Sequence, residues 1–327
     1  MIEARGLTKR YGTKTAVDEL TFTVRPGIVT GFLGPNGAGK STTMRLAIGL
    51  DRPTGGTITI NSQRYRDFPA PLREVGVLLE ARAIHTGRTA YKHLLAVAQT
   101  HGVPRRRVDE VLGLVGLTEV AGKRVGGFSL GMGQRLGIAQ AMLGDPGVLI
   151  LDEPVNGLDP EGIRWIRNLL QTLATEGRTI FVSSHLMSEM AQTATHLIVV
   201  GRGKLIADTS VEDFIRSASG SAVHVRTPHA ARLTEALEAA GAHVTLTGTE
   251  TLDVSDWTAA QIGDAAFAAG VPLHELTPRQ VSLEDAFMDI TRDAVEYSHG
   301  QAPSPRVPAS TAAGHADAGA NTARGQA

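Results

Sequence analysis

The stretch that most restricts the fold of this chain is GFLGPNGAGKSTT, residues 31–43, which follows an apolar run and precedes a helical pattern. It contains the pattern G-x-x-x-x-G-K-S, and such a loop between a strand and a helix turns backbone N–H groups toward bound phosphates. We therefore predict that Lys40 reaches the β- and γ-phosphates of a nucleotide and that the Ser41 hydroxyl holds Mg²⁺. The residues expected to contact the nucleotide form one run: Gly34, Pro35, Asn36, Gly37, Ala38, Gly39, Lys40, Ser41 and Thr42.

Composition narrows the class of protein. The chain has 327 residues, of which 42% are hydrophobic, so it can bury a substantial core in two domains, or in one domain with a large appendage. A net charge of −1 gives no global attraction to nucleic acid or anionic lipid. Cysteine is absent, which excludes disulfides and thiolate metal sites. No stretch offers the roughly 18 apolar residues of a membrane span. We expect a soluble, cytoplasmic chain without direct membrane insertion.

Alternating strand and helix patterns indicate an α/β core. Residues 28–34, 148–152 and 179–184 are apolar runs bounded by turn residues, as in strands buried on both faces. Helical patterns at 160–176 and 185–194 follow two of them. The sequence therefore predicts a mostly parallel sheet flanked by helices.

A different pattern fills residues 87–116, where apolar spacing fits two amphipathic helices. We predict a helical subdomain at about 81–144, inserted in the α/β body. Residues 196–208 read as a β-hairpin.

Beyond residue 218 the order of patterns becomes β-α-β-β-α-β, which is typical of a ferredoxin-like α+β module. We predict a nucleotide-binding α/β core at 1–218, this accessory domain at 219–296, and a disordered tail rich in Ala, Gly, Pro and Ser at 297–327. The module shows no glycine loop or ligand cluster. It could bind a small regulator, but a structural role, such as stabilising a dimer, is favoured.

The run VLILDEP, residues 148–154, supplies the second half of the nucleotide site. A strand that ends in Asp152 delivers a carboxylate to the magnesium ion. Glu153 comes next and is a candidate general base for the attacking water. His185 ends another apolar strand, where a neutral imidazole could donate to a phosphate oxygen. The other ten histidines show no paired ligand spacing, so we predict no transition-metal site.

Five stretches in one order resemble the ATP-binding subunit of ABC transporters over residues 2–217: GPNGAGKST, VGVLLEARA, FSLGMGQRL, VLILDEPVNGLD and SSH. The resemblance implies that Ser129 and Gly131 belong to the signature that contacts the γ-phosphate of a partner subunit's ATP. It also implies that Asp159 belongs to the D-loop, that His185 is the switch histidine and that Tyr11 stacks on adenine.

Two positions depart from the family pattern. Glu80 stands where the Q-loop usually has glutamine, and we expect it to contact Mg²⁺ or the attacking water. Leu130 replaces the first glycine of the signature L-S-G-G-Q. With the appended C-terminal module, these features resemble the bacitracin- and daunorubicin-type drug-export branch.

The resemblance implies an ATP- and Mg²⁺-dependent ATPase that works as a homodimer or pseudo-symmetric dimer. It would energise a separate integral-membrane permease, on the inner face of the cell membrane, for export of a drug, antibiotic or lipid-like compound. The alternative is a soluble ABC ATPase that acts on ribosomes or DNA. One nucleotide cassette and the absence of sustained heptads argue against it, and we expect no nucleic-acid partner.

Overall fold

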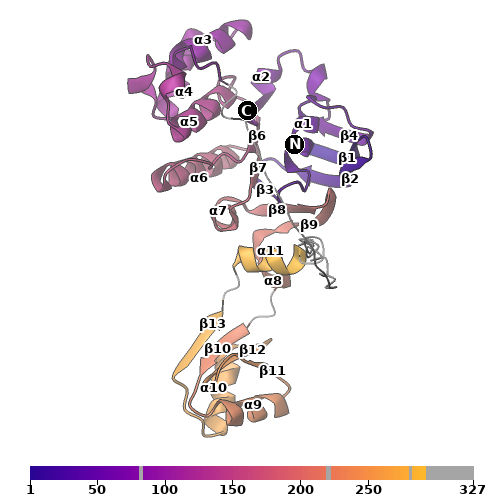
Figure 1. The fold of residues 1–327 in the computed structure, drawn as a ribbon, viewed down its shortest axis with the longest axis vertical. Coiled ribbons are helices and arrows are strands. Elements are labelled where there is room, and N and C mark those ends of the chain that lie inside the picture. The colour runs from indigo at the N-terminus through magenta and orange to yellow at the C-terminus, as the bar shows by residue number, and fades with distance from the viewer. Residues whose placement is uncertain (81–83, 219–221, 280–281, 292–327) are drawn as a thin grey trace, which may run out of the picture. The chain divides into compact units, whose positions relative to one another are not determined.

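The structure of the chain is a computed structural model that describes residues 1–80, 84–218, 222–279 and 282–291. Within these ranges the strands form three sheets (Figure 1). The predicted disordered tail lies outside the described residues. The predicted domain boundaries remain predictions.

The largest sheet has six strands and carries the glycine loop. Its strands, in order across the sheet, are β5 (Val75–Leu78), β6 (Val148–Asp152), β7 (Thr179–Ser184), β3 (Val29–Leu33), β8 (His196–Gly201) and β9 (Lys204–Ser210). All neighbouring strands pair in parallel except β8 and β9, which form the predicted antiparallel hairpin. The parallel α/β core predicted from the apolar runs is confirmed.

Alternate residues of this sheet enter two separate cores because successive side chains of a strand point to opposite faces. On one face, Phe32 and Phe181 lie with their ring centroids 5.0 Å apart and pack with Phe22 of the N-terminal sheet. That three-stranded antiparallel sheet has the order β2 (Lys14–Val24), β1 (Ile2–Tyr11) and β4 (Gly55–Ile60). On the other face, Leu33 and Val182 pack into a core built mainly of helices.

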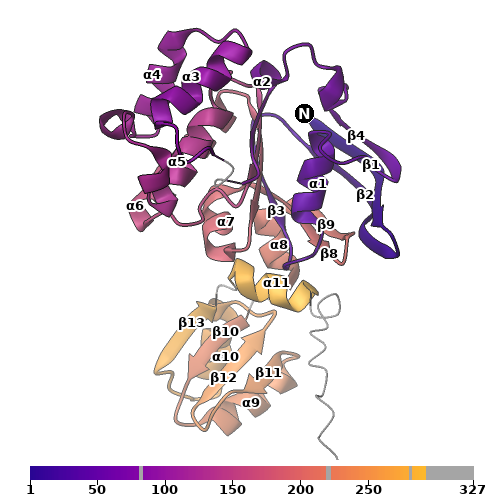
Figure 2. The same cartoon turned by 45° about the horizontal axis from the view of Figure 1, so that its top comes forward.

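The helices that contribute to this second core surround that face (Figure 2). They include α6, α7 and α8, whose bounds are Pro160–Thr175, Met187–Thr193 and Val211–Ala218. Helix α7 begins two residues later than the predicted start at 185, because Leu186 has an extended backbone (φ −91°, ψ 97°). Helix α1 (Lys40–Ala47) follows the glycine loop and buries Met44 in the first core.

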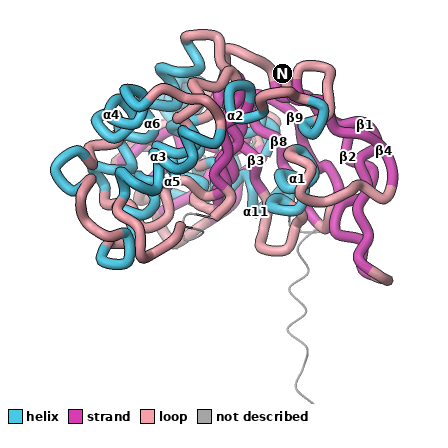
Figure 3. The backbone as a smooth tube through the Cα atoms, turned by 90° about the horizontal axis from the view of Figure 1, so that it is seen from above, coloured by secondary structure: helices cyan, strands magenta, loops and turns pink. Residues whose placement is uncertain are grey.

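The predicted amphipathic helices between 87 and 116 are present as α3 (Ala90–Thr100) and α4 (Arg105–Leu114). The Thr89 side chain caps α3 by accepting from the Lys92 N–H at 3.2 Å. Helices α3 and α4 pack with α5 (Leu130–Ala141), and the three gather away from the N-terminal sheet (Figure 3). One short helix, α2, spans Pro71–Glu74, and 3₁₀ turns occupy Tyr65–Asp67, Thr118–Val120 and Val125–Gly127.

The C-terminal residues contain the predicted ferredoxin-like arrangement. Its four antiparallel strands have the order β11 (His243–Leu246), β12 (Thr251–Ser255), β10 (Ala222–Arg226) and β13 (Glu275–Arg279). Helices α9 (Ala230–Ala239) and α10 (Ala259–Ala268) share a core with this sheet. The closing helix α11 (Leu283–Thr291) packs on α7 and α8, where Leu283 and Phe287 join the helical core.

Candidate active site

The loop between β3 and α1 has the backbone that the glycine pattern predicts. Gly39 is the N-cap of α1 and has φ +103°, and Gly37 has φ +80°, so both lie in the region that favours glycine. A Cβ at Gly39 would lie 2.5 Å from the carbonyl oxygen of Ala16. The loop therefore needs glycine at position 39 for both conformation and space.

Lys40 is folded over this loop. Its Nζ donates to the carbonyl oxygens of Gly34 at 2.6 Å and Pro35 at 3.3 Å, and the residue is 7% exposed. Burial lowers the pKa of Lys40, and the charges of Glu153 and Asp152 oppose that shift. The ammonium group thus lies at the centre of the loop, near two carboxylates that favour its charged form.

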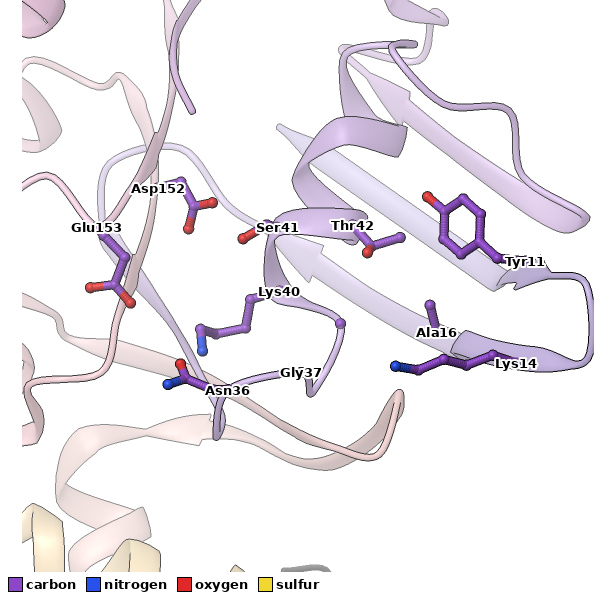
Figure 4. A pocket seen from close by; sticks show the side chains of 11 residues that line it. Tyr11, Lys14, Ala16, Asn36, Gly37, Lys40, Ser41, Thr42, Asp152 and Glu153 are labelled. Atoms are coloured by element: carbon purple, nitrogen blue, oxygen red, sulfur yellow. The ribbon is translucent and has the colours of Figure 1, made fainter. Parts of the chain in front are cut away.

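A cavity of about 360 Å³ opens beside the loop (Figure 4). Its walls come from the N-terminal sheet, from the glycine loop with α1, and from the end of β6. The lining residues are Tyr11, Lys14, Ala16, Asn36, Gly37, Gly39, Lys40, Ser41, Thr42, Asp152 and Glu153. In the figure Asp152, Glu153 and Lys40 point toward one another, and Tyr11 lies at the far side of the cavity. Three segments distant in sequence therefore meet around one space, and the sequence did not single out Lys14 or Ala16.

The carboxylate of Glu153 contacts His185. Its Oε2 lies 2.8 Å from Nδ1 of His185 and 3.3 Å from the His185 backbone N. Because an ionised carboxylate only accepts hydrogen bonds, Nδ1 is the donor. A neutral His185 ring then presents Nε2 as an acceptor, and only a protonated ring could donate to a phosphate oxygen through Nε2. The structure thus brings the two predicted catalytic residues together. The single N–H of a neutral His185 ring is then already donated to the Glu153 carboxylate.

Tyr11 is held by charged neighbours from the N-terminal sheet, from α1 and from the segment between α1 and β4. Its hydroxyl donates to Asp51 at 3.0 Å, and the same carboxylate oxygen accepts from Arg45 Nε at 2.8 Å. The bond to Arg45 is the main cause of the lowered pKa of Asp51. The Lys9 ammonium lies 4.8 Å from the centroid of the Tyr11 ring. These contacts fix an otherwise exposed ring at the edge of the cavity.

The signature residues lie at another place in the chain. Ser129 is exposed, caps α5 by accepting from the Met132 N–H at 3.2 Å, and lines a separate cavity of about 330 Å³. Helix α5 begins at Leu130, so Ser129 is its N-cap residue. Gly131 and Ser129 are not among the residues that line the first cavity.

Leu130, the departure from the signature pattern, packs on Gly157, which lies in the segment 156–159 that the resemblance assigns to the D-loop. A Cβ at Gly157 would overlap the Leu130 side chain, and Gly157 has φ +75°. Glycine at 157 thus accommodates the bulk that Leu130 adds. Asp159, also in the D-loop, caps α6 by accepting from the Gly162 N–H at 2.9 Å.

Glu80 is exposed and is the last described residue before position 84. It is not among the residues that line the first cavity. Its expected contact with Mg²⁺ or water stays a prediction.

Comparisons with known proteins decide the family. A model of the ABC transporter family matches residues 17–156, and a model described as a domain of unknown function matches residues 221–284. The chain is 35% identical to the uncharacterized ABC transporter ATP-binding protein YcbN of Bacillus subtilis over 297 residues. The aligned stretch covers 89% of this chain and 96% of that protein. The chain belongs to the ABC transporter ATP-binding subunits. The resemblance identified from the five stretches is confirmed, and the chain is an ABC-type ATPase that binds and hydrolyses ATP.

Two further comparisons agree with this ABC ATPase assignment. The bacitracin transport ATP-binding protein BcrA of Bacillus licheniformis is 45% identical over 211 residues, which cover 64% of this chain and 69% of that protein. A solved ATP-binding subunit of an ABC transporter superimposes with a TM-score of 0.61 at 29% identity, covering 66% of this chain and 92% of the other.

Among the described residues, no helix is long and apolar enough to cross a membrane. The same residues hold no cluster of three or more His, Cys, Asp or Glu side chains suited to a metal ion. Ser41 and Asp152 nevertheless line the same cavity. Their hydroxyl and carboxylate oxygens are suitable ligands for an Mg²⁺ ion that is also bound by phosphates.

Proposed function

We propose that two copies of this ATPase, or this chain and a similar one, drive a separate membrane permease that exports an antibiotic-type compound. The observation that carries the proposal is the separation of the signature from the nucleotide cavity within one chain. Ser129 is exposed at a second cavity, while Lys40, Asp152 and Glu153 line the first. A second subunit that faces the first with its own signature would complete each site.

Within such a site each residue of the chain has a distinct role. Lys40 and the N–H groups of the glycine loop bind the phosphates, and Tyr11 stacks on the base. Mg²⁺, held by Ser41 and Asp152, would neutralise phosphate charge. Glu153 orients the attacking water and accepts its proton, while His185 fixes the Glu153 carboxylate at 2.8 Å.

Export of an antibiotic is supported by similarity to the bacitracin transport protein BcrA. The subunit would then work at the cytoplasmic face of the cell membrane, bound to its permease. We expect cells that make this chain, with the membrane protein that co-purifies with it, to tolerate severalfold more bacitracin than cells with the Lys40→Ala chain. Equal tolerance would contradict bacitracin as cargo, and failure to capture any membrane protein would contradict a permease partner.

A mixture of two inactive variants tests the shared site. Lys40→Ala removes the phosphate-binding ammonium, and Ser129→Asp keeps an acceptor for the Met132 N–H but puts negative charge beside the partner's γ-phosphate. Each variant alone should be inactive. Half of randomly mixed dimers contain one of each, with one complete site, so we expect about a quarter of the wild-type ATPase rate.

The matched control mixes Lys40→Ala with Asp152→Ala, two changes in the same half-site. No dimer of that mixture has a complete site, and its ATPase rate should stay at background. An inactive mixture of Lys40→Ala with Ser129→Asp would rule out a site shared between subunits.

A further inference from the structure

The backbone at Glu153 has a conformation that side chains disfavour. Glu153 follows the last residue of β6 and has φ +51°, in the left-handed region. A non-glycine residue stays in that region only where its surroundings hold it, and such positions are concentrated at functional sites. The neighbours that hold this peptide are therefore candidates for a role in the reaction.

Two side chains bind the two backbone polar groups of Glu153. The Glu153 N–H donates to Ser183 Oγ at 3.0 Å, and the Glu153 carbonyl oxygen accepts from Gln134 Nε2 at 3.0 Å. Ser183 is fully buried and Gln134 is 3% exposed, so water competes little for these bonds. Both ends of the Glu153 residue are thus fixed by buried groups.

Ser183 also binds the neighbouring carboxylate, since its hydroxyl donates to Asp152 Oδ1. A serine hydroxyl has one proton to donate and two lone pairs that accept, so both bonds form at once. One oxygen atom therefore ties the proposed metal ligand, Asp152, to the backbone of the proposed base, Glu153. Ser183 can do this because it pairs with Asp152 on the adjacent strand of the sheet.

Gln134 comes from a different element, the helix α5 that Ser129 caps. The same helix places Leu130 against Gly157 of the D-loop. The signature helix is thus bonded directly to the peptide of Glu153.

We infer that Ser183 and Gln134 are positioning residues for ATP hydrolysis, because together they hold Glu153 in the left-handed conformation that directs its carboxylate to His185. The inference rests on the proposed role of Glu153 as the base. Without the Ser183 hydroxyl, the Glu153 N–H loses its partner and the backbone relaxes toward negative φ. The carboxylate then leaves its place beside His185, while the phosphate-binding loop keeps its form.

The test is steady-state ATPase kinetics of the full chain with Mg-ATP, comparing Ser183→Ala and Gln134→Met with the wild type. We expect kcat to fall at least tenfold in Ser183→Ala and about fivefold in Gln134→Met, with KM for ATP within twofold of the wild-type value. Ser183→Thr, which restores a hydroxyl, should recover most of the lost kcat. A purely structural defect would instead lower the thermal midpoint and raise KM.

Matched controls remove a serine hydroxyl and a glutamine amide that do not bond Glu153. Ser184→Ala deletes a buried hydroxyl on the same strand that accepts from the Leu186 N–H, and Gln140→Met deletes an amide on α5 that bonds His93. Both should keep kcat within twofold of the wild type. Controls as slow as Ser183→Ala and Gln134→Met would overturn the inference, as would Ser183→Ala with unchanged kcat.

The Glu153→Gln variant separates failure of this inference from failure of the proposed function. If Glu153→Gln stops turnover but Ser183→Ala does not slow it, only the positioning role is wrong. If Glu153→Gln turns over ATP at the wild-type rate, Glu153 is not the general base, and the positioning role of Ser183 and Gln134 is wrong as well.

Discussion

Replacing Glu153 by glutamine is expected to lower ATP turnover at least a hundredfold while ATP still binds. Glutamine keeps the size of the side chain but loses the negative charge that accepts a proton, and general bases contribute about a hundredfold to ten-thousandfold. The loop with Lys40 is unchanged, so nucleotide affinity should stay within a few-fold of the wild-type value. Because hydrolysis no longer separates the subunits, the variant should accumulate as an ATP-bound dimer.

Two measurements check this expectation. Phosphate release gives kcat, and size-exclusion chromatography with ATP present gives the fraction of dimer. Glu161→Gln is the matched control, since it removes the same charge from an exposed position in the first turn of α6 and should leave both quantities unchanged. Full turnover by Glu153→Gln would show that another group activates the water.

The nucleotide cavity could be anticipated from sequence because its parts are local patterns. The glycine loop combines a strand, a turn with positive φ and a helix N-terminus within 13 residues, and each part has its own signal. Asp152 and Glu153 follow a buried apolar run, so their place at the carboxyl edge of a parallel sheet also follows from sequence. Likewise, the β-α-β-β-α-β order was sufficient to predict the C-terminal sheet.

The contacts that join these parts could not be predicted in the same way. Ser183 is the next-to-last residue of β7, and only the pairing of β6 with β7 shows that its hydroxyl meets Asp152. Gln134 is separated from Glu153 by 19 positions, and nothing in its local pattern indicates a bond to that peptide. A polar residue in a buried run was the one available signal, because such a group usually has a specific partner.

The two departures from the family pattern had different outcomes. Leu130 is explained by Gly157, whose missing side chain leaves room for it. That contact joins the first residue of α5 to a loop residue 27 positions further along the chain, a relation that only the folded chain displays. Glu80 lies at the edge of the described residues, and its role stays a prediction.

Substituting Gly39 by alanine is expected to weaken ATP binding at least a hundredfold. The new Cβ would lie 2.5 Å from the Ala16 carbonyl oxygen, and the backbone at φ +103° is strained for any residue with a side chain. Strain of this kind costs about 1–3 kcal/mol before the overlap with Ala16 is counted, and 2.8 kcal/mol corresponds to about a hundredfold in affinity. The loop must shift to relieve both, and its N–H groups then leave the phosphates. Titration of the purified chain with ATP in the absence of hydrolysis measures the dissociation constant.

Gly37 provides the control that separates strain from overlap. It also has positive φ, at +80°, but a Cβ there would meet no atom within 4 Å. Gly37→Ala therefore carries the cost of strain alone, about 1 kcal/mol, which corresponds to roughly a fivefold loss of affinity. If both variants bound ATP equally well, the close approach of Gly39 to Ala16 would not be what shapes the loop. A much larger loss in Gly39→Ala would instead show that strand β2, which carries Ala16, helps to set the geometry of the phosphate site from outside the glycine pattern itself.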